Sequence, residues 1–195
     1  MRHLLPSLAI VLGVGCSTAQ SVRSDSVAAP AAEAHTAADV RFMRDMIAHH
    51  GQALIMSELA PTRTERQSIR LLAERIAVSQ RDEIELMENW LRRRGDTDDS
   101  APHHEHSHAG HAMPGMATDD DLSRLGSATG DQFDRLFLEL MIRHHEGALV
   151  MVAELFQTPG AAQRSEVYRI ASEIDADQRA EIARMRALRN GLPGS

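Results

Sequence analysis

The stretch MIAHHGQALIM at residues 46–56 returns later in the chain as MIRHHEGALVM at residues 141–151. In both copies Met, His-His, Ala and Met recur at steps of three and four, the spacing of one face of an α-helix. The segments that follow also match, because QRDEIELM at residues 80–87 aligns with QRAEIARM at residues 178–185. The chain therefore repeats a helical hairpin, and two hairpins with one apolar face each bury these faces best against each other. We predict an all-α fold, a four-helix bundle.

Changes in composition along the 195 residues predict one folded domain, residues 38–191, behind an N-terminal extension. An Ala/Ser/Thr-rich stretch without a pattern indicates a tether, and a His/Gly/Pro-rich stretch between the hairpins indicates a loop. The predicted parts are a signal segment at residues 1–16, a flexible tether at 17–37, a first hairpin at 38–95, a loop at 96–118 and a second hairpin at 119–191.

Helix ends inside the two hairpins follow from proline, glycine and the apolar period. Pro61 should end the first helix, since proline cannot continue a helix. We expect the second helix over residues 65–94. The third should begin at Asp119 or Gly130 and end at Phe156, and the fourth should span residues 162–189.

The N-terminal sequence MRHLLPSLAIVLGVGCSTAQ has a basic start and an apolar run too short to span a bilayer. It predicts an exported protein, periplasmic or at the cell surface. Cys16 follows the apolar run as the lipidated cysteine of a bacterial lipoprotein does, so we expect a lipid anchor there and no other membrane contact. Cleavage by the ordinary signal peptidase is the alternative. The net charge of −7 and the aromatic content of 3% argue against a nucleic-acid partner.

The repeated motif places His and Met side chains together on the apolar face of each hairpin. On a helix, Met46, His49, His50 and Met56 fall within an arc of roughly 120°, and Met87 of the next helix is spaced to face them. The candidate metal ligands of the two copies are Met46, His49, His50, Met56 and Met87, then Met141, His144, His145, Met151 and Met185.

Imidazole and thioether together suit a soft metal ion. Thioethers select Cu(I), and imidazole also suits Cu(II), zinc and nickel, whereas magnesium and calcium prefer oxygen. The loop adds a secondary set in the tract HHEHSHAGHAMPGM: His103, His104, His106, His108, His111, Met113 and Met116. We predict copper as the bound ion, ahead of zinc or nickel. A solvated linker is the alternative for the loop.

Other interpretations of the same residues stay open. Methionine at helical spacing often only fills a core, and a histidine on an apolar face is often structural. Because a duplication also copies structural features, the second motif is not independent support for metal binding. Arg143 and Glu146 flank the second His pair, which suggests that this pair is more exposed than the first.

The chain resembles the "domain of unknown function 305" family in the pattern Met46, His49, His50, Ala53, Met56, followed by Gln80, Glu83, Ile84 and Met87, and in its repeat. The resemblance covers roughly residues 38–190. It implies a small exported bacterial protein with a ferritin-like helical bundle and, for some members, copper binding and copper tolerance. A di-iron site would need Glu-x-x-His on two helices, and the only such motif runs from Glu105 to His108 in the loop.

Three functions are compatible with these features. The first is a non-enzymatic binding protein that sequesters copper or delivers it to a delivery or efflux partner. The second is a copper-dependent oxidase, although Glu83 and Glu181 are as readily explained as hairpin-stabilising charges near Arg81 and Arg179. The third is a structural module in which the His pairs only pack helices. Metal binding separates the first two from the third, and turnover separates the first from the second.

Overall fold

The computed structural model describes residues 35–96 and 113–193 of the chain, which lie in one unit, Glu33–Ser195. The described residues form helices and no strand. The helices are α1 (Ala37–Arg63), α2 (Gln67–Arg92), α3 (Asp119–Ser127), α4 (Gly130–Gln157) and α5 (Ser165–Asn190). The all-α prediction is confirmed, and both expected starts of the third helix exist, because the short α3 precedes α4.

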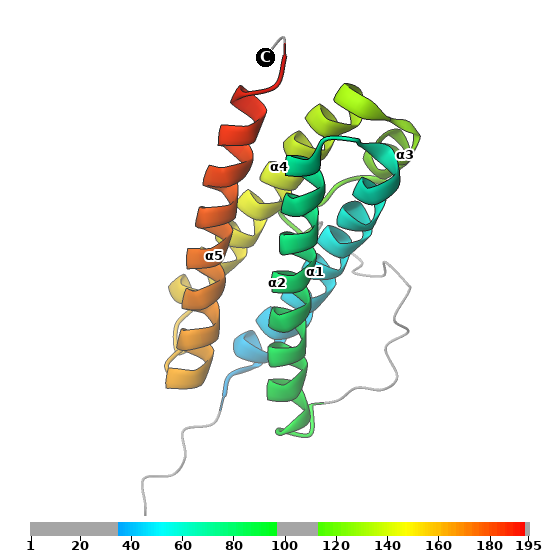
Figure 1. Cartoon of the computed structure of the whole chain (residues 1–195). Helices are drawn as coiled ribbons and strands as arrows, with labels where there is room; N and C mark the ends of the chain where they lie inside the picture. The colour runs from blue at the N-terminus through cyan, green and yellow to red at the C-terminus, as the bar shows by residue number, and fades with distance from the viewer. Residues whose placement is uncertain (1–34, 97–112, 194–195) are drawn as a thin grey trace, which may run out of the picture. The chain divides into compact units, whose positions relative to one another are not determined.

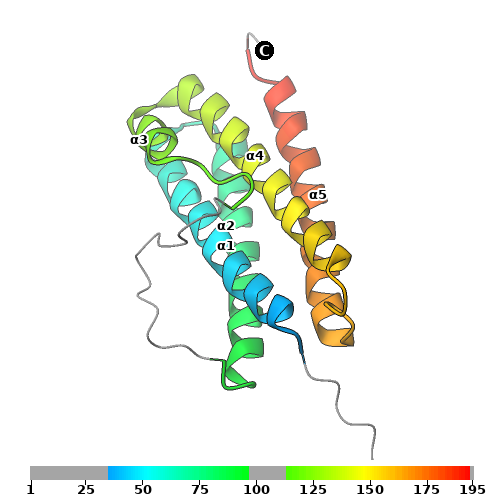
Figure 2. The ribbon, with the colours of Figure 1, turned by 180° about the vertical axis from the view of Figure 1, so that it is seen from behind.

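The four long helices pack as two antiparallel hairpins, α1 with α2 and α4 with α5 (Figure 1). α1 also packs against α4, and α2 against α5, which closes the four-helix bundle that the repeat predicts. The short α3 lies across α1 and α4 at one end (Figure 2). The α1–α4 contact matters most for the site, since each of these helices carries one His pair.

Capping boxes fix where the first helix of each half begins. Thr36 accepts a hydrogen bond from the Asp39 amide at 3.1 Å, and its own amide donates to the Asp39 carboxylate at 2.8 Å. Thr118 and Asp121 form the same box at the start of α3. Such reciprocal bonds satisfy amides that would otherwise have no partner in the first turn.

Pro61 does not end α1, contrary to the sequence prediction. The helix continues through Pro61 to Arg63, and the amide of Thr64 still donates to the Ala60 carbonyl at 3.2 Å. A proline removes the hydrogen bond of its own nitrogen, and its ring crowds the carbonyl four residues back. The later hydrogen bond from Thr64 to Ala60 is kept, so the helix ends two residues after the proline.

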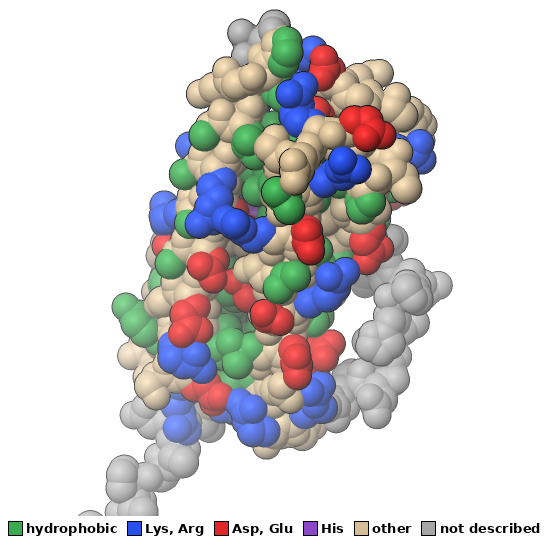
Figure 3. Space-filling model, in the orientation of Figure 1, with side chains coloured by type: hydrophobic (Ala, Val, Ile, Leu, Met, Phe, Trp, Pro, Cys, Tyr) green, Lys and Arg blue, Asp and Glu red, His purple; other side chains and the backbone are tan. Residues whose placement is uncertain are grey.

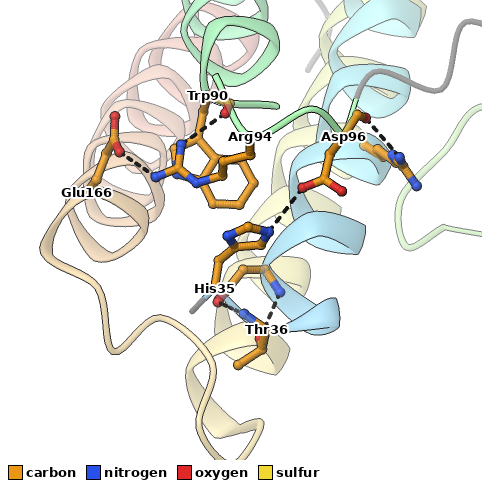
Figure 4. Close-up of polar contacts among 8 residues, drawn as sticks. His35, Thr36, Trp90, Arg94, Asp96 and Glu166 are labelled. Atoms are coloured by element: carbon orange, nitrogen blue, oxygen red, sulfur yellow. Dashed lines mark hydrogen bonds and ion pairs between the residues drawn. The ribbon is translucent and has the colours of Figure 1, made fainter. Parts of the chain in front are cut away.

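Ion pairs fasten the two ends of the bundle. At one end, Arg66 in the α1–α2 turn binds Asp134 at 2.8 Å and Asp131 at 2.7 Å, at the start of α4. At the other end, Arg94 lies 4.0 Å from the centre of the Trp90 ring and binds Glu166 of α5 at 2.8 Å (Figure 4). The hairpins are thus joined at both ends as well as through the core.

His35 and Asp96 also meet at the second end, 3.0 Å apart, beside Trp90 (Figure 4). These two residues are where the described chain begins and where its first range stops. The chain therefore enters α1 and leaves the first hairpin at the same end of the bundle.

The core consists of two apolar clusters. We name them after their methionines. The Met46 cluster contains Met43, Met46, Met87 and Met151. The Met56 cluster contains Met56, Met141 and Met185. Every one of these side chains is buried.

Outside, basic and acidic side chains intermingle over α2 and α5, with smaller hydrophobic areas between them (Figure 3). Within residues 35–96 and 113–193, no helix is both long and apolar enough to cross a membrane. The predicted signal segment, and most of the tether before His35, lie outside the described residues.

Candidate metal centre

Four histidines meet in the middle of the bundle. His49 and His50 come from α1, His144 and His145 from α4, and each is at most 1% exposed. The expectation that the second pair is more exposed is wrong. Its flanking charges turn outward instead, because Arg143 binds Asp121 and Glu146 binds Arg186 at the surface.

The rings of His49 and His144 contact each other across the α1–α4 interface, with centres 3.8 Å apart and planes tilted by 34°. Nε2 of His144 donates to the backbone carbonyl of His49 at 2.9 Å, and Nε2 of His49 donates to the carbonyl of Pro114 at 3.0 Å. A carbonyl only accepts hydrogen bonds, so each ring carries its proton on Nε2. In the neutral ring Nδ1 then bears a free lone pair.

His50 and His145 each share a hydrogen bond with a carboxyl group from the other helix of their hairpin. Nε2 of His50 lies 2.5 Å from Glu83, and Nε2 of His145 lies 2.7 Å from Glu181. Carboxyl groups that hold a ligating histidine are typical of the outer shell of metal sites.

The structure corrects the sequence interpretation of these two glutamates as charges beside Arg81 and Arg179. Those arginines bind Glu58 and Asp175 instead. The sequence did contain a sign that these glutamates pair with the histidines: both repeats have a glutamate at the same position of the second helix.

The Nδ1 atoms of all four imidazoles are buried and have no hydrogen-bond partner within the described parts of the chain. Nearby on α2 and α5, the buried amides of Gln80 and Gln178 also have unpartnered atoms there. Buried polar groups are nearly always hydrogen-bonded, so a concentration of exceptions in one layer needs an explanation. The Nδ1 lone pairs of His49 and His144, whose ring protons are fixed on Nε2 by carbonyl acceptors, are suited to coordinating a metal ion.

Burial keeps His49, His50 and His144 neutral. It lowers the pKa of His49 and of His50 from 6.5 to about 3, and it also lowers the pKa of His144 well below 6.5, helped by the neighbouring histidines. Burial and the nearby carboxylates of Asp177 and Glu181 raise the pKa of Glu83 from 4.5 to about 8. A neutral imidazole is the form that binds metal, so these rings need lose no charge before they coordinate.

The predicted methionine ligands are all buried in the two clusters, but they are not grouped by hairpin. Met46 and Met87 of the first half share their cluster with Met151 of the second half. Met56 of the first half shares its cluster with Met141 and Met185. The sequence analysis grouped each motif within its own hairpin, whereas the antiparallel approach of α1 and α4 mixes the two copies. Met43, which sequence reasoning missed, belongs to the first cluster.

Among the described residues, no three His, Asp or Glu side chains are arranged so that they could hold one ion. A site here would therefore combine imidazoles with thioethers or require the rings to turn. The loop histidines His103, His104, His106, His108 and His111, and the lipidation candidate Cys16, lie outside the described residues.

The last part of the predicted loop is described, and it lies over the histidines. We call residues 113–118 the strap. Met113 packs against the Met46 cluster, Met116 is half-buried, and the side chain of Gln52 in α1 hydrogen-bonds both backbone groups of Ala117. Sequence reasoning missed Gln52, because one polar residue in an apolar motif gives no sign of its partner.

The family profile described as Domain of unknown function (DUF305) matches residues 39–189. A DUF305 fragment from Deinococcus radiodurans is 35% identical with a TM-score of 0.70, and the match covers 81% of this chain and 99% of that one. A DUF305 protein from Streptomyces coelicolor, described as a proposed secreted protein, is 32% identical with a TM-score of 0.65, over 77% of this chain and 91% of that one.

CopM in its Cu(II)-bound form is 32% identical with a TM-score of 0.64, over 78% of this chain and 96% of that one. CopM is also known in Cu(I)-bound and silver-bound forms. No curated protein matches the chain. The profile match over residues 39–189 and the solved relatives above 30% identity agree with the repeated motif. The chain therefore belongs to the DUF305 family.

Proposed function

We propose that this chain is an exported copper-binding protein that sequesters copper or delivers it to a partner. The observation that carries the proposal is the layer of four buried imidazoles whose Nδ1 atoms lack a partner among the described residues. Methionine clusters accompany these imidazoles in the core, so the same helices supply nitrogen and soft sulfur donors.

The chain prepares the nitrogen donors in advance. Hydrogen bonds engage Nε2 of every ring, and at His49 and His144, where the acceptor is a backbone carbonyl, they leave the Nδ1 lone pair for the ion. The imidazoles can hold Cu(II), and thioethers favour Cu(I), so a mixed set retains the ion in both oxidation states. Zinc and nickel would use the imidazoles alone, which is why we place them second.

The relatives support this proposal. CopM, which has been solved with Cu(II), Cu(I) and silver, shares the fold at 28–32% identity across its forms. Silver(I) is a soft ion like Cu(I) and prefers the same sulfur donors. The Streptomyces coelicolor relative, described as a proposed secreted protein, fits the export predicted from the N-terminal sequence. We also propose the lipid anchor at Cys16 and a second, weaker copper-binding role for the His-rich loop.

A Cu(I) competition titration with a chromophoric chelator tests the proposal on the full chain. One variant carries His49→Leu with His144→Leu, and another carries Asn at the five loop histidines. His35→Gln is the control, since His35 lies at the end of the bundle beside Trp90 and Asp96. We expect tight binding in wild type, in the control and in the loop variant, and weakened binding in the double variant.

Three other outcomes would redirect the assignment. Binding lost only with the loop histidines would make the bundle a scaffold. Binding absent in wild type would favour the structural module, in which the His–Glu pairs only join helices. Oxygen consumption with Cu(I) present in excess, at a rate above that of Cu(I) without the protein, would instead indicate an oxidase.

A further inference from the structure

The strap, residues 113–118, runs across α1 and α4 before α3 begins (Figure 2), where it contacts His49 of α1 and Gly147 of α4. It begins at the Met46 cluster, against which Met113 packs, and reaches the Met56 cluster, to which Ala117 belongs. Between them, the carbonyl of Pro114 accepts the Nε2 proton of His49. The strap therefore contacts His49 and both methionine clusters.

Besides His49, α1 holds the strap through the side chain of Gln52. Gln52 Nε2 donates to the Ala117 carbonyl at 2.9 Å, and the Ala117 amide donates to Gln52 Oε1 at 2.7 Å. Both bonds are buried, and Gln52 is only 6% exposed. Losing this side chain would leave two buried backbone groups without partners.

α4 makes room for the strap at Gly147. A Cβ there would lie 2.0 Å from the Pro114 carbonyl oxygen, far inside contact distance. Gly115 fits equally closely, because its φ is +76° and a Cβ would lie 2.3 Å from the Arg143 carbonyl oxygen. Glycine in the middle of a helix weakens the helix relative to alanine, so the close approach explains why Gly147 stands there.

Gln52 and Gly147 occupy the same position in the two repeats, three residues after the first histidine of each pair. The copies differ at this position, and both residues suit the strap. The side chain of Gln52 hydrogen-bonds it, and the missing side chain of Gly147 leaves space for it. The duplicated bundle has therefore adapted both halves to one unduplicated segment. A linker that only connected the hairpins would not require such matching.

We propose that the strap is a releasable cover that controls the passage of ions to and from the His49–His144 pair. This proposal rests on the proposed copper-binding function and adds how the ion enters and leaves the site. The other covering elements are helices of 26 to 28 residues, whereas the strap is a short non-helical segment held by a few contacts. Segments with few buried contacts open at a lower free energy than the helices of a core.

The test compares Gly147→Ala with Gly51→Ala in the full chain. Both substitutions add one methyl group to the interior of a helix, but a Cβ at Gly51 meets none of the described atoms within 4 Å. Gln52→Leu is the second variant. It removes the two hydrogen bonds to Ala117 without changing a glycine. Three rates are measured: hydrogen exchange of the Ala117 amide, modification of His49 and His144 by diethyl pyrocarbonate, and transfer of bound Cu(I) to excess chelator.

We expect all three rates to rise about tenfold in Gly147→Ala and in Gln52→Leu, and to stay within about twofold of wild type in Gly51→Ala. Faster amide exchange with unchanged histidine modification and Cu(I) transfer would overturn the proposal, since the strap would then open without uncovering the site. Unchanged amide exchange in both variants would overturn it too. If wild type binds no Cu(I), the proposed function fails, and the histidine modification rates alone decide whether the strap is a cover.

Discussion

At the scale of single residues, the site depends on how its imidazoles are held rather than on their number. His49 and His144 donate to backbone carbonyls, and His145 is held by Glu181 at 2.7 Å. In the proposed copper site, these bonds would set the ring orientations before an ion arrives, which would lower the cost of ordering the ligands on binding. A flexible histidine tract has no such preparation.

Glu181→Gln should lower the affinity for Cu(I) by about 10- to 100-fold, the usual effect of removing an outer-shell carboxylate from a ligating histidine. The matched control is Glu173→Gln, which lies on the same helix and binds Arg169 at the surface. The chelator competition titration measures both. Equal affinities of the two variants would show that Glu181 does not orient a ligand.

The stability of the metal-free protein should peak near pH 6.5. His49 and His50 have pKa values near 3 when folded and 6.5 ordinarily, so the unfolded chain binds more protons between these values and stability is lost as the pH falls. We expect a loss on the order of 2 kcal/mol for each of these histidines between pH 6.5 and 4.5.

Glu83 has the opposite effect, because its pKa is about 8 when folded and 4.5 ordinarily. The folded state binds this proton more tightly, so stability declines as the pH rises towards 8. Urea unfolding across this pH range measures both limbs. Glu83→Gln should flatten the alkaline limb and steepen the acid limb, because Glu83 opposes the histidines between pH 4.5 and 6.5. A metal-free protein equally stable at pH 4.5 and 6.5 would contradict this account of the buried histidines.

At the scale of elements, the repeat and its helical period were enough to predict the long helices. They did not predict the capping boxes or the strap. Met46, His49 and Met56 recur with a helical period, so the helix and its buried face follow from the sequence alone. The pairing of His50 with Glu83 depends on the register of two helices, which no local pattern specifies. The position of the strap depends on Gln52 and Gly147. Gln52 binds a residue 65 positions away in the sequence, and Gly147 contacts a segment outside its own helix.

The start of α1 should be more important to stability than an ordinary helix cap. Asp39 closes the capping box with Thr36, and its other carboxylate oxygen accepts the buried amide of Ala162, 2.7 Å away in the α4–α5 turn. Asp39→Ala should therefore cost about 2 to 4 kcal/mol, against about 1 kcal/mol for a cap alone.

Asp121→Ala is the matched comparison for Asp39→Ala, because Asp121 holds the same position in the more exposed capping box of α3. Urea unfolding of both variants gives the two free energies. If Asp39→Ala were no more destabilising than Asp121→Ala, the link from α1 to the α4–α5 turn would contribute nothing.

At the scale of the whole molecule, the duplication matters because the copies are interleaved. Each methionine cluster draws on both hairpins, and the contacting His49–His144 pair joins them at the centre. The sequence predicted the two motifs but grouped them by hairpin, since the crossing of α1 and α4 is a property of the packed bundle.

Met46→Leu and Met151→Leu should therefore weaken Cu(I) binding through one shared site, although they lie in different repeats. Leucine keeps the volume and apolar character of methionine, so folding should be little affected. In a double-mutant cycle the combined loss of affinity should be smaller than the sum of the two single losses. Strict additivity would point to separate sites in the two hairpins.

The most direct test of the central claim is the X-ray absorption spectrum of the chain carrying one equivalent of Cu(I), recorded with and without the five loop histidines. We predict both nitrogen and sulfur neighbours around copper, in the same proportions when all five loop histidines are replaced by Asn. A spectrum without sulfur, or one that changes when the loop histidines are removed, would contradict a site built from the imidazoles and methionines of the bundle.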